Sequence, residues 1–193
     1  PKAGLELKFG KPDKSLFLLG LTIMFASFCE GGMFDWSGVY FKEVIKVEVY
    51  TAGYFTFMFC MALSRWYLDK IIVKVGHKNI YTFSSILIVS GVLLSTSFPF
   101  FIPAMVGFAM IGIGAAVVIP TTFLLAGDSN KYSPGLSIAI VSTYSIIGML
   151  IGPTFIGFLS NAYGLRLALL FLAFTGACIL PISKWYFRIN PKN

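Results

Sequence analysis

The sequence predicts an all-α integral membrane protein built as a bundle of six transmembrane helices. The chain is 57% hydrophobic and only 12% charged, whereas an average soluble domain is about 25% charged. Two stretches, 79–127 and 132–165, contain 49 and 34 residues without a charge, and a spanning helix needs roughly 20 apolar residues. The alternating pattern of a membrane β-barrel is absent from the sequence, so helices are expected throughout.

Charged clusters and Gly/Pro punctuation divide the chain into spans. The first apolar run follows a polar, basic start, and the second ends at a group of charged residues. The long uncharged run holds two helices, because Pro99 and Pro103 force a stop and a restart. A serine followed by Pro134 is typical of a helix start and opens the fifth span. The expected spans are 15–40, 50–68, 80–96, 101–126, 134–159 and 167–186.

The basic residues indicate how these six spans are oriented. An even number of spans places both termini on one side, and 12 of the 15 Lys and Arg residues then lie on that side. Because excess Lys and Arg mark the cytoplasmic face, both termini are expected in the cytoplasm. The same rule explains the net charge of +7. No basic stripe forms, so a nucleic-acid partner is not expected.

Two carboxylates in or near the first span need an explanation. Glu30 lies roughly 22 Å along a helix that begins at Ser15, inside a hydrocarbon core about 30 Å thick. An ionised carboxylate there requires a partner, a proton or an interior position. Glu30 is therefore a candidate proton-binding or substrate-pairing acid, with a structural hydrogen-bonded acid as the alternative. Asp35 lies further out, next to Trp36, and is either a second functional acid or a solvated interfacial one.

Gly31 and Gly32 separate the two acids. A glycine pair weakens a helix by roughly 1 kcal/mol per residue and permits unwinding near a binding site, as in many transporters. Close packing against a neighbouring helix is the more common reason for such a pair. Both interpretations stay open from the sequence.

A second group of charges follows the second span, in the segment SRWYLDK (64–70) and the nearby VGHK (75–78). Arg65 and Asp69 are one helical turn apart, so they can pair locally. Asp69 also faces the compartment in which the fifth span begins, and a carboxylate is stabilised at a helix N-terminus. These two residues are candidates for a cytoplasmic gate.

The fifth span contains the segment GMLIGPTFIG (148–157). Its small residues at four-residue spacing permit close helix contact, and a proline inside a span produces a kink. Kinked, glycine-faced helices occur both in moving and in static bundles. The candidate kink and packing residues are Gly148, Gly152, Pro153 and Gly157.

Several hydroxyl side chains near mid-membrane are candidates for lining a pathway, although each can instead bond to its own helix backbone. Ser27 precedes Glu30 by three residues and therefore shares its helix face. The other candidates lie on the fourth and fifth spans: Thr121, Thr122, Ser142 and Tyr144.

Three of these patterns together resemble the major facilitator superfamily, specifically its C-terminal six-helix half. The segments 64–70 and 75–78 resemble the cytoplasmic G-R-x-x-x-D-R…G-R/H-K motif, with Ser64 and Leu68 replacing its glycines. GPTFIG (152–157) resembles a fifth-helix G-P-x-x-x-G pattern. EGGMFDWS (30–37) is similar to the E-G-x-M-x-D-W-S sequence found in the seventh helix of a bacterial subset, and is the most specific match.

The resemblance implies half of a major-facilitator fold, made of two inverted three-helix repeats. Residues 1–14 would then be the remnant of the cytoplasmic loop joining two halves, 15–187 the transmembrane domain and 188–193 a cytoplasmic tail. The implied function is secondary active transport of a small solute, coupled to protons, across a bacterial inner membrane. The implied partners are the lipid bilayer and either a missing N-terminal half or a second copy of this chain.

Two other functions remain open: a stand-alone six-helix protein acting as a homodimer, and a membrane receptor or assembly factor that does not transport. An enzyme is not expected, since the sequence has no nucleophile–base pair. Cys29, Cys60, Cys178 and His77 lack the spacing of metal ligands, and no cofactor is expected. The sequence does not define the solute.

Overall fold

The computed structural model describes residues 13–129 and 131–191, except for the side chains at positions 68, 69, 71 and 73. Most of the expected loop remnant 1–14 and the end of the tail lie outside this part. The helices are α1 (Lys14–Tyr40), continued by the π-helical turn η1 (Phe41–Ile45), α2 (Thr51–Trp66), α3 (Leu68–Val75), α4 (His77–Ser97), α5 (Phe101–Gly127), α6 (Pro134–Tyr163) and α7 (Leu165–Ile189).

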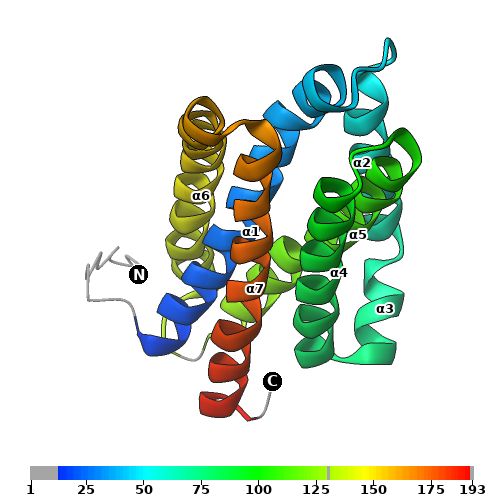
Figure 1. Cartoon of the computed structure of the whole chain (residues 1–193). Coiled ribbons are helices and arrows are strands. Elements are labelled where there is room, and N and C mark those ends of the chain that lie inside the picture. Colours follow the sequence, from blue (N-terminus) through cyan, green and yellow to red (C-terminus); the bar gives the residue numbers. More distant parts are fainter. Residues whose placement is uncertain (1–12, 130, 192–193) are drawn as a thin grey trace.

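The helices form a single bundle in which successive spans run in opposite directions, so that α1 begins and α7 ends at the lower end of the view (Figure 1). In the described part of the chain, five helical segments are long and apolar enough to cross a membrane: α1 with η1, α4, α5, α6 and α7. Five of the six expected spans are thus present as long apolar helices, and α2 occupies the place of the remaining one.

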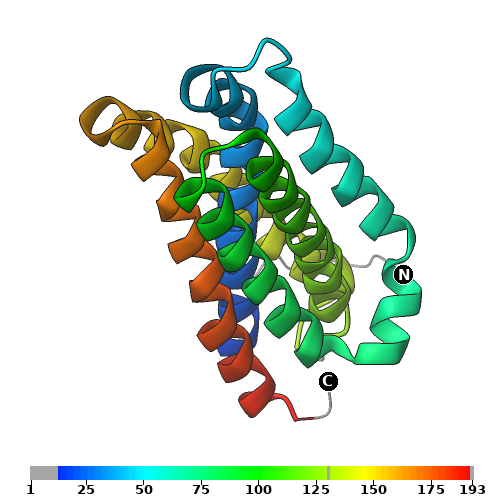
Figure 2. The same ribbon diagram turned by 45° about the vertical axis from the view of Figure 1, so that its right-hand side comes forward.

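The remaining expected span, 50–68, corresponds to α2, and a short helix, α3, follows it. The sequence predicted an end near residue 68, but a second helical piece continues to Val75. The break falls at Tyr67, whose backbone has φ −96° and ψ 3°. Figure 2 shows α3 turned away from the line of α2 at the base of the bundle.

Helix α1 lies at the centre of the bundle and packs against α2, α5, α6 and α7, whereas α4 packs against α5 and α7. Glycines bring several of these pairs into close contact. A Cβ built on Gly91 of α4 would lie 2.6 Å from the Gly107 carbonyl oxygen of α5, and one built on Gly107 would lie 2.5 Å from the Gly91 carbonyl oxygen. Such close approach of backbones is the usual means of joining helices in lipid, where burial of apolar side chains gives little preference for protein over lipid.

Candidate functional site

Glu30 and Arg65 form an ion pair between α1 and α2. Arg65 Nη2 donates a hydrogen bond to Glu30 Oε1 at 2.9 Å. The two side chains differ in exposure: 10% of the Glu30 side chain is accessible, against 42% of the Arg65 side chain. Glu30 is therefore the enclosed member of the pair, and Arg65 is the more exposed one.

The second carboxylate oxygen of Glu30 is unusual. Glu30 Oε2 is buried and has no hydrogen-bond partner among the described residues. A carboxylate has about four acceptor positions, and a buried acceptor without a partner loses free energy comparable to a missing hydrogen bond. Glu30 is thus half satisfied, and its free oxygen can accept a proton or a donor from outside this chain.

Arg65 reaches Glu30 because of its depth in the bundle. From Ile45 back to Glu30, and from Thr51 forward to Arg65, the chain covers roughly 21–22 Å of helix. The two helices run antiparallel from the turn between them, so both residues lie at similar depth. The position of Arg65 at the membrane face stays a prediction, and the chain continues past it as the short helix α3.

The other proposed gate residue, Asp69, lies in α3, and its side chain is outside the described part of the structure. The local Arg65–Asp69 pair therefore stays a prediction. Ser64, immediately before Arg65, donates its hydroxyl to the Cys60 carbonyl at 2.8 Å.

Gly31 and Gly32 do not interrupt the helix, because α1 is continuous from Lys14 to Tyr40. A Cβ on Gly31 would lie 2.7 Å from the Met149 carbonyl oxygen of α6, and one on Gly32 would lie 3.1 Å from a Leu172 methyl carbon of α7. The glycine pair serves close packing, which was the second of the two interpretations open from the sequence.

The proline of α6 faces this packing. Pro153 has no N–H, so it cannot donate to the Met149 carbonyl one turn earlier, and that carbonyl lies against Gly31. Trp36 of α1 donates its indole N–H to the Pro153 carbonyl at 2.9 Å. A Cβ on Gly157 would lie 3.2 Å from the Trp36 ring. The part of α1 from Gly31 to Trp36 therefore packs against the proline region of α6.

Gly148 and Gly152 extend the same contact. A side chain at Gly148 would collide with the Met24 carbonyl, and a Cβ at Gly152 would lie 2.5 Å from the Phe28 carbonyl oxygen. We refer to the contact made by Gly31, Gly148 and Gly152 as the α1–α6 seam. It holds α1 from Met24 to Gly31, the stretch that ends beside Glu30.

Asp35 lies apart from the ion pair. Its side chain is exposed and lines a hollow of about 290 Å³ with Lys42 and residues at the start of α2, among them Thr51 and Tyr54. The structure does not bring Asp35 and Glu30 together. Its position agrees with a solvated acid near one mouth of the bundle.

The candidate pathway residues fall into two groups. Ser27 and Ser145 join α1 to α6 through hydroxyls 2.6 Å apart, and the Tyr144 ring packs over Gly20. Ser142 donates to the Ile138 carbonyl of its own helix. These residues lie on the α1 and α6 side of the bundle.

Thr121 and Thr122, in contrast, are fully buried and donate to carbonyls of α5. Thr122 is also 2.8 Å from the Tyr81 hydroxyl of α4. It therefore faces the packed interior between α4 and α5, and a position on a pathway is not supported for it.

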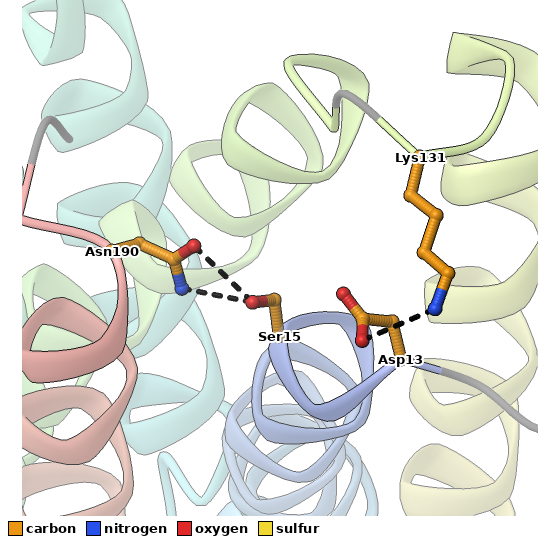
Figure 3. A network of polar contacts seen from close by, with 4 residues as sticks. All are labelled: Asp13, Ser15, Lys131 and Asn190. Atoms are coloured by element: carbon orange, nitrogen blue, oxygen red, sulfur yellow. Dashed lines mark hydrogen bonds and ion pairs between the residues drawn. The ribbon is translucent and has the colours of Figure 1, made fainter.

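A polar network that the sequence did not predict joins three segments where α1 begins and α7 ends (Figure 3). Ser15 and Asn190 exchange hydrogen bonds of 2.9 and 3.2 Å. Lys131, in the α5–α6 connection, lies 3.5 Å from Asp13. The partners are more than 100 positions apart in the chain, so no local pattern marks them.

Curated relatives match most of this chain. It is 30% identical over 174 residues to the uncharacterized transporter y4wD of Sinorhizobium fredii, covering 89% of this chain and 46% of that protein. It is 29% identical over 175 residues to the membrane protein MosC of Rhizobium meliloti, covering 90% and 43%. An uncharacterized MFS-type transporter of Yersinia pestis is 28% identical over 159 residues, covering 81% and 41%. The chain thus spans less than half the length of these relatives.

A solved structure shows the same fold. The crystal structure of a peptide transporter POT (E310Q mutant) in complex with alafosfalin superposes with a TM-score of 0.76 at 18% identity, over 94% of this chain and 39% of the other. No family model matches the sequence. The relatives and the long apolar helices indicate a multi-pass membrane protein. The chain is thus similar to proteins named as transporters, one of them of the MFS type, in agreement with the resemblance that the three sequence patterns carry.

Proposed function

We propose that this chain is the C-terminal half of a proton-coupled secondary transporter of a bacterial inner membrane, with Glu30 as the proton-binding acid. The transporter moves a small solute by alternating access, and no chemical conversion of the solute takes place. The observation that carries the proposal is the enclosed Glu30 carboxylate, which is held by Arg65 through one oxygen and has no partner for the other.

This arrangement suits a reversible proton site. Burial disfavours a charged carboxylate and the Arg65 guanidinium favours it, so the preferred form of Glu30 depends on whether water and Arg65 are present. Opening of the bundle to either side changes both the access of water to Glu30 and the contact of Glu30 with Arg65. A carboxylate in such a balance can take up a proton in one state of the transporter and release it in the other.

The surroundings of the pair support a role in movement. Arg65 is two residues from the break at Tyr67 that separates α2 from α3, and Glu30 is next to the α1–α6 seam with its proline. Helix α2 therefore ends close to Arg65, and α1 contacts the proline region of α6 close to Glu30. Interfaces of this kind allow segments to shift as units between two packed arrangements.

A complete transport route needs a second body. This chain spans less than half of its curated relatives, and many apolar side chains of α2 and α6 are exposed, such as Phe55, Phe59, Leu150 and Phe158. Lipid or another protein must cover these surfaces. The N-terminal half, or a second copy of this chain, would complete the cavity next to Glu30 and Arg65.

Solute-dependent proton movement tests this function. The full-length transporter would be reconstituted into liposomes containing a pH-sensitive dye and exposed to pools of small sugars, amino acids, amines and carboxylates. We expect at least one pool to drive proton movement in the wild type and in the Glu43→Gln control, whose acid is exposed, and not in Glu30→Gln. Full proton movement in Glu30→Gln would overturn the role of Glu30, and no response to any pool would count against transport.

A further inference from the structure

A hollow rich in positive charge lies between the start of α4 and the end of α7. It has a volume of about 600 Å³ and is lined by Lys78, Lys184, Phe187, Arg188, Asn190 and Pro191. Phe187 is buried and packs against Tyr81 of α4, with ring centroids 5.8 Å apart. This contact holds the start of α4 against the end of α7, and so it holds the residues that line the hollow in place.

The three cations of the hollow are uncompensated. Lys78, Lys184 and Arg188 are all exposed, and the charged group of each side chain has no ion-pair or hydrogen-bond partner among the described residues. Among the residues that the structure describes, the lining contains no carboxylate. Like charges gathered without a counter-charge repel one another, so a bound anion would relieve the repulsion and stabilise this end of the bundle.

The position of the hollow indicates which anion is available. Lys184 and Arg188 lie in the last two turns of a helix that crosses the membrane, and Lys78 lies in the first turn of another. Trp185, between the two α7 cations, is 59% exposed, as expected for a ring at the level of lipid headgroups. Basic pockets between transmembrane helices at this level bind anionic headgroups.

We propose that Lys78, Lys184 and Arg188 form a binding site for the phosphate headgroup of an anionic phospholipid, whose acyl chains lie along α4 and α7. The positive-inside rule accounts for the number of cations at this end of the bundle. It does not account for three unpaired cations from two helices around one hollow. The lipid would join α4 to α7 at this end, and its binding is independent of the solute and of proton coupling.

Lipid binding can be measured on the full-length transporter by native mass spectrometry and by thermal unfolding in detergent. The probes are phosphatidylglycerol, phosphatidylcholine and inorganic phosphate. We expect the wild type to retain phosphatidylglycerol in preference to phosphatidylcholine and to unfold at higher temperature with it. The triple variant Lys78→Gln, Lys184→Gln, Arg188→Gln should lose this preference by about tenfold or more, since each cation near an anionic surface adds measurable affinity.

A control variant with the same loss of charge distinguishes a specific lipid site from general attraction between anionic lipid and the positive charge of the protein. Lys14→Gln, Lys42→Gln, Lys74→Gln removes three exposed cations away from the hollow and should keep the phosphatidylglycerol preference. Equal losses in the two triple variants would overturn the site, as would equal retention of both lipids by the wild type. Stabilisation by millimolar inorganic phosphate that matches the effect of the lipid would also overturn it, because the site would then serve a soluble anion.

Discussion

At the scale of single residues, the Glu30–Arg65 pair is asymmetric. The Glu30 side chain is nearly enclosed, while that of Arg65 is 42% accessible. The two charges therefore meet different surroundings when the partner is lost. An Arg65 cation without Glu30 can still reach water or headgroups with its long side chain. A Glu30 anion without Arg65 stays buried and uncompensated.

This asymmetry predicts unequal effects of removing either partner. Breaking a fully buried pair costs about 3–5 kcal/mol. Because Arg65 is partly exposed, we expect Arg65→Gln to lower the free energy of unfolding by about 2 kcal/mol, and Glu30→Gln by less than 1 kcal/mol. The measurement is unfolding of the full-length transporter in detergent. The double variant should be less destabilised than the sum of the two single ones, and strict additivity would show that the pair contributes nothing to the folded state.

The sequence showed that Glu30 needed a partner but not which residue provides it. Depth along a helix can be estimated from rise per residue, and this placed Glu30 within the hydrocarbon slab. Finding Arg65 required knowing how α1 and α2 pack, because the two residues lie 35 positions apart in the chain. The segment around Tyr67 has no glycine or proline to signal a break followed by more helix. Charged residues near a span end favoured the membrane face as the position of Arg65.

At the scale of helices, the α1–α6 seam joins the acidic helix to the proline helix by backbone contact. Small residues at four-residue spacing predicted close packing of 148–157, and the structure identifies α1 as the partner. The sequence could not identify it, because the contacts join positions more than 100 residues apart. Hydropathy located the long helices with boundaries a few residues short, since uncharged polar residues such as Asn161 continue a helix past its apolar run.

The seam predicts that glycines of α6 differ sharply in their tolerance of a methyl group. Gly148→Ala and Gly152→Ala would press Cβ atoms against the Met24 and Phe28 carbonyls, so we expect each to destabilise the fold by about 1–3 kcal/mol. Gly135, in the first turn of the same helix, has open space around it. Gly135→Ala should be neutral or stabilising by up to about 1 kcal/mol.

Thermal unfolding of the three variants in one detergent provides the comparison. Equal melting temperatures for Gly135→Ala and Gly152→Ala would show that α1 and α6 are not in backbone contact at this position.

At the scale of the whole molecule, the charge distribution predicts the orientation in the membrane. With Arg65 placed inside the bundle, eleven Lys and Arg residues remain on the side of the termini and three on the other. The three include Arg166, which donates to the Thr96 and Ser97 carbonyls at the end of α4. Removing Arg65 from the count leaves a large excess on the side of the termini.

We therefore expect both termini of this segment to be cytoplasmic and the turn at 46–50 to face outward. Reporter enzymes active on only one side of the membrane would be fused after Asn193, and inserted after Glu48, in the full-length protein. Cytoplasmic activity at the first position and external activity at the second support this orientation. The reverse pattern would contradict it, and activity on one side at both positions would contradict the six-span topology.

If Glu30 couples proton movement to solute movement, two kinds of transport respond differently to its loss. Exchange of labelled for unlabelled solute across a liposome membrane needs the change between inward-open and outward-open states but no net proton movement. Accumulation driven by a pH gradient needs both. The most direct measurement compares the two in the full-length Glu30→Gln transporter, with the solute found by the dye assay. We expect exchange to persist and accumulation to be lost. Accumulation at wild-type levels, or loss of exchange together with accumulation, would contradict this role of Glu30.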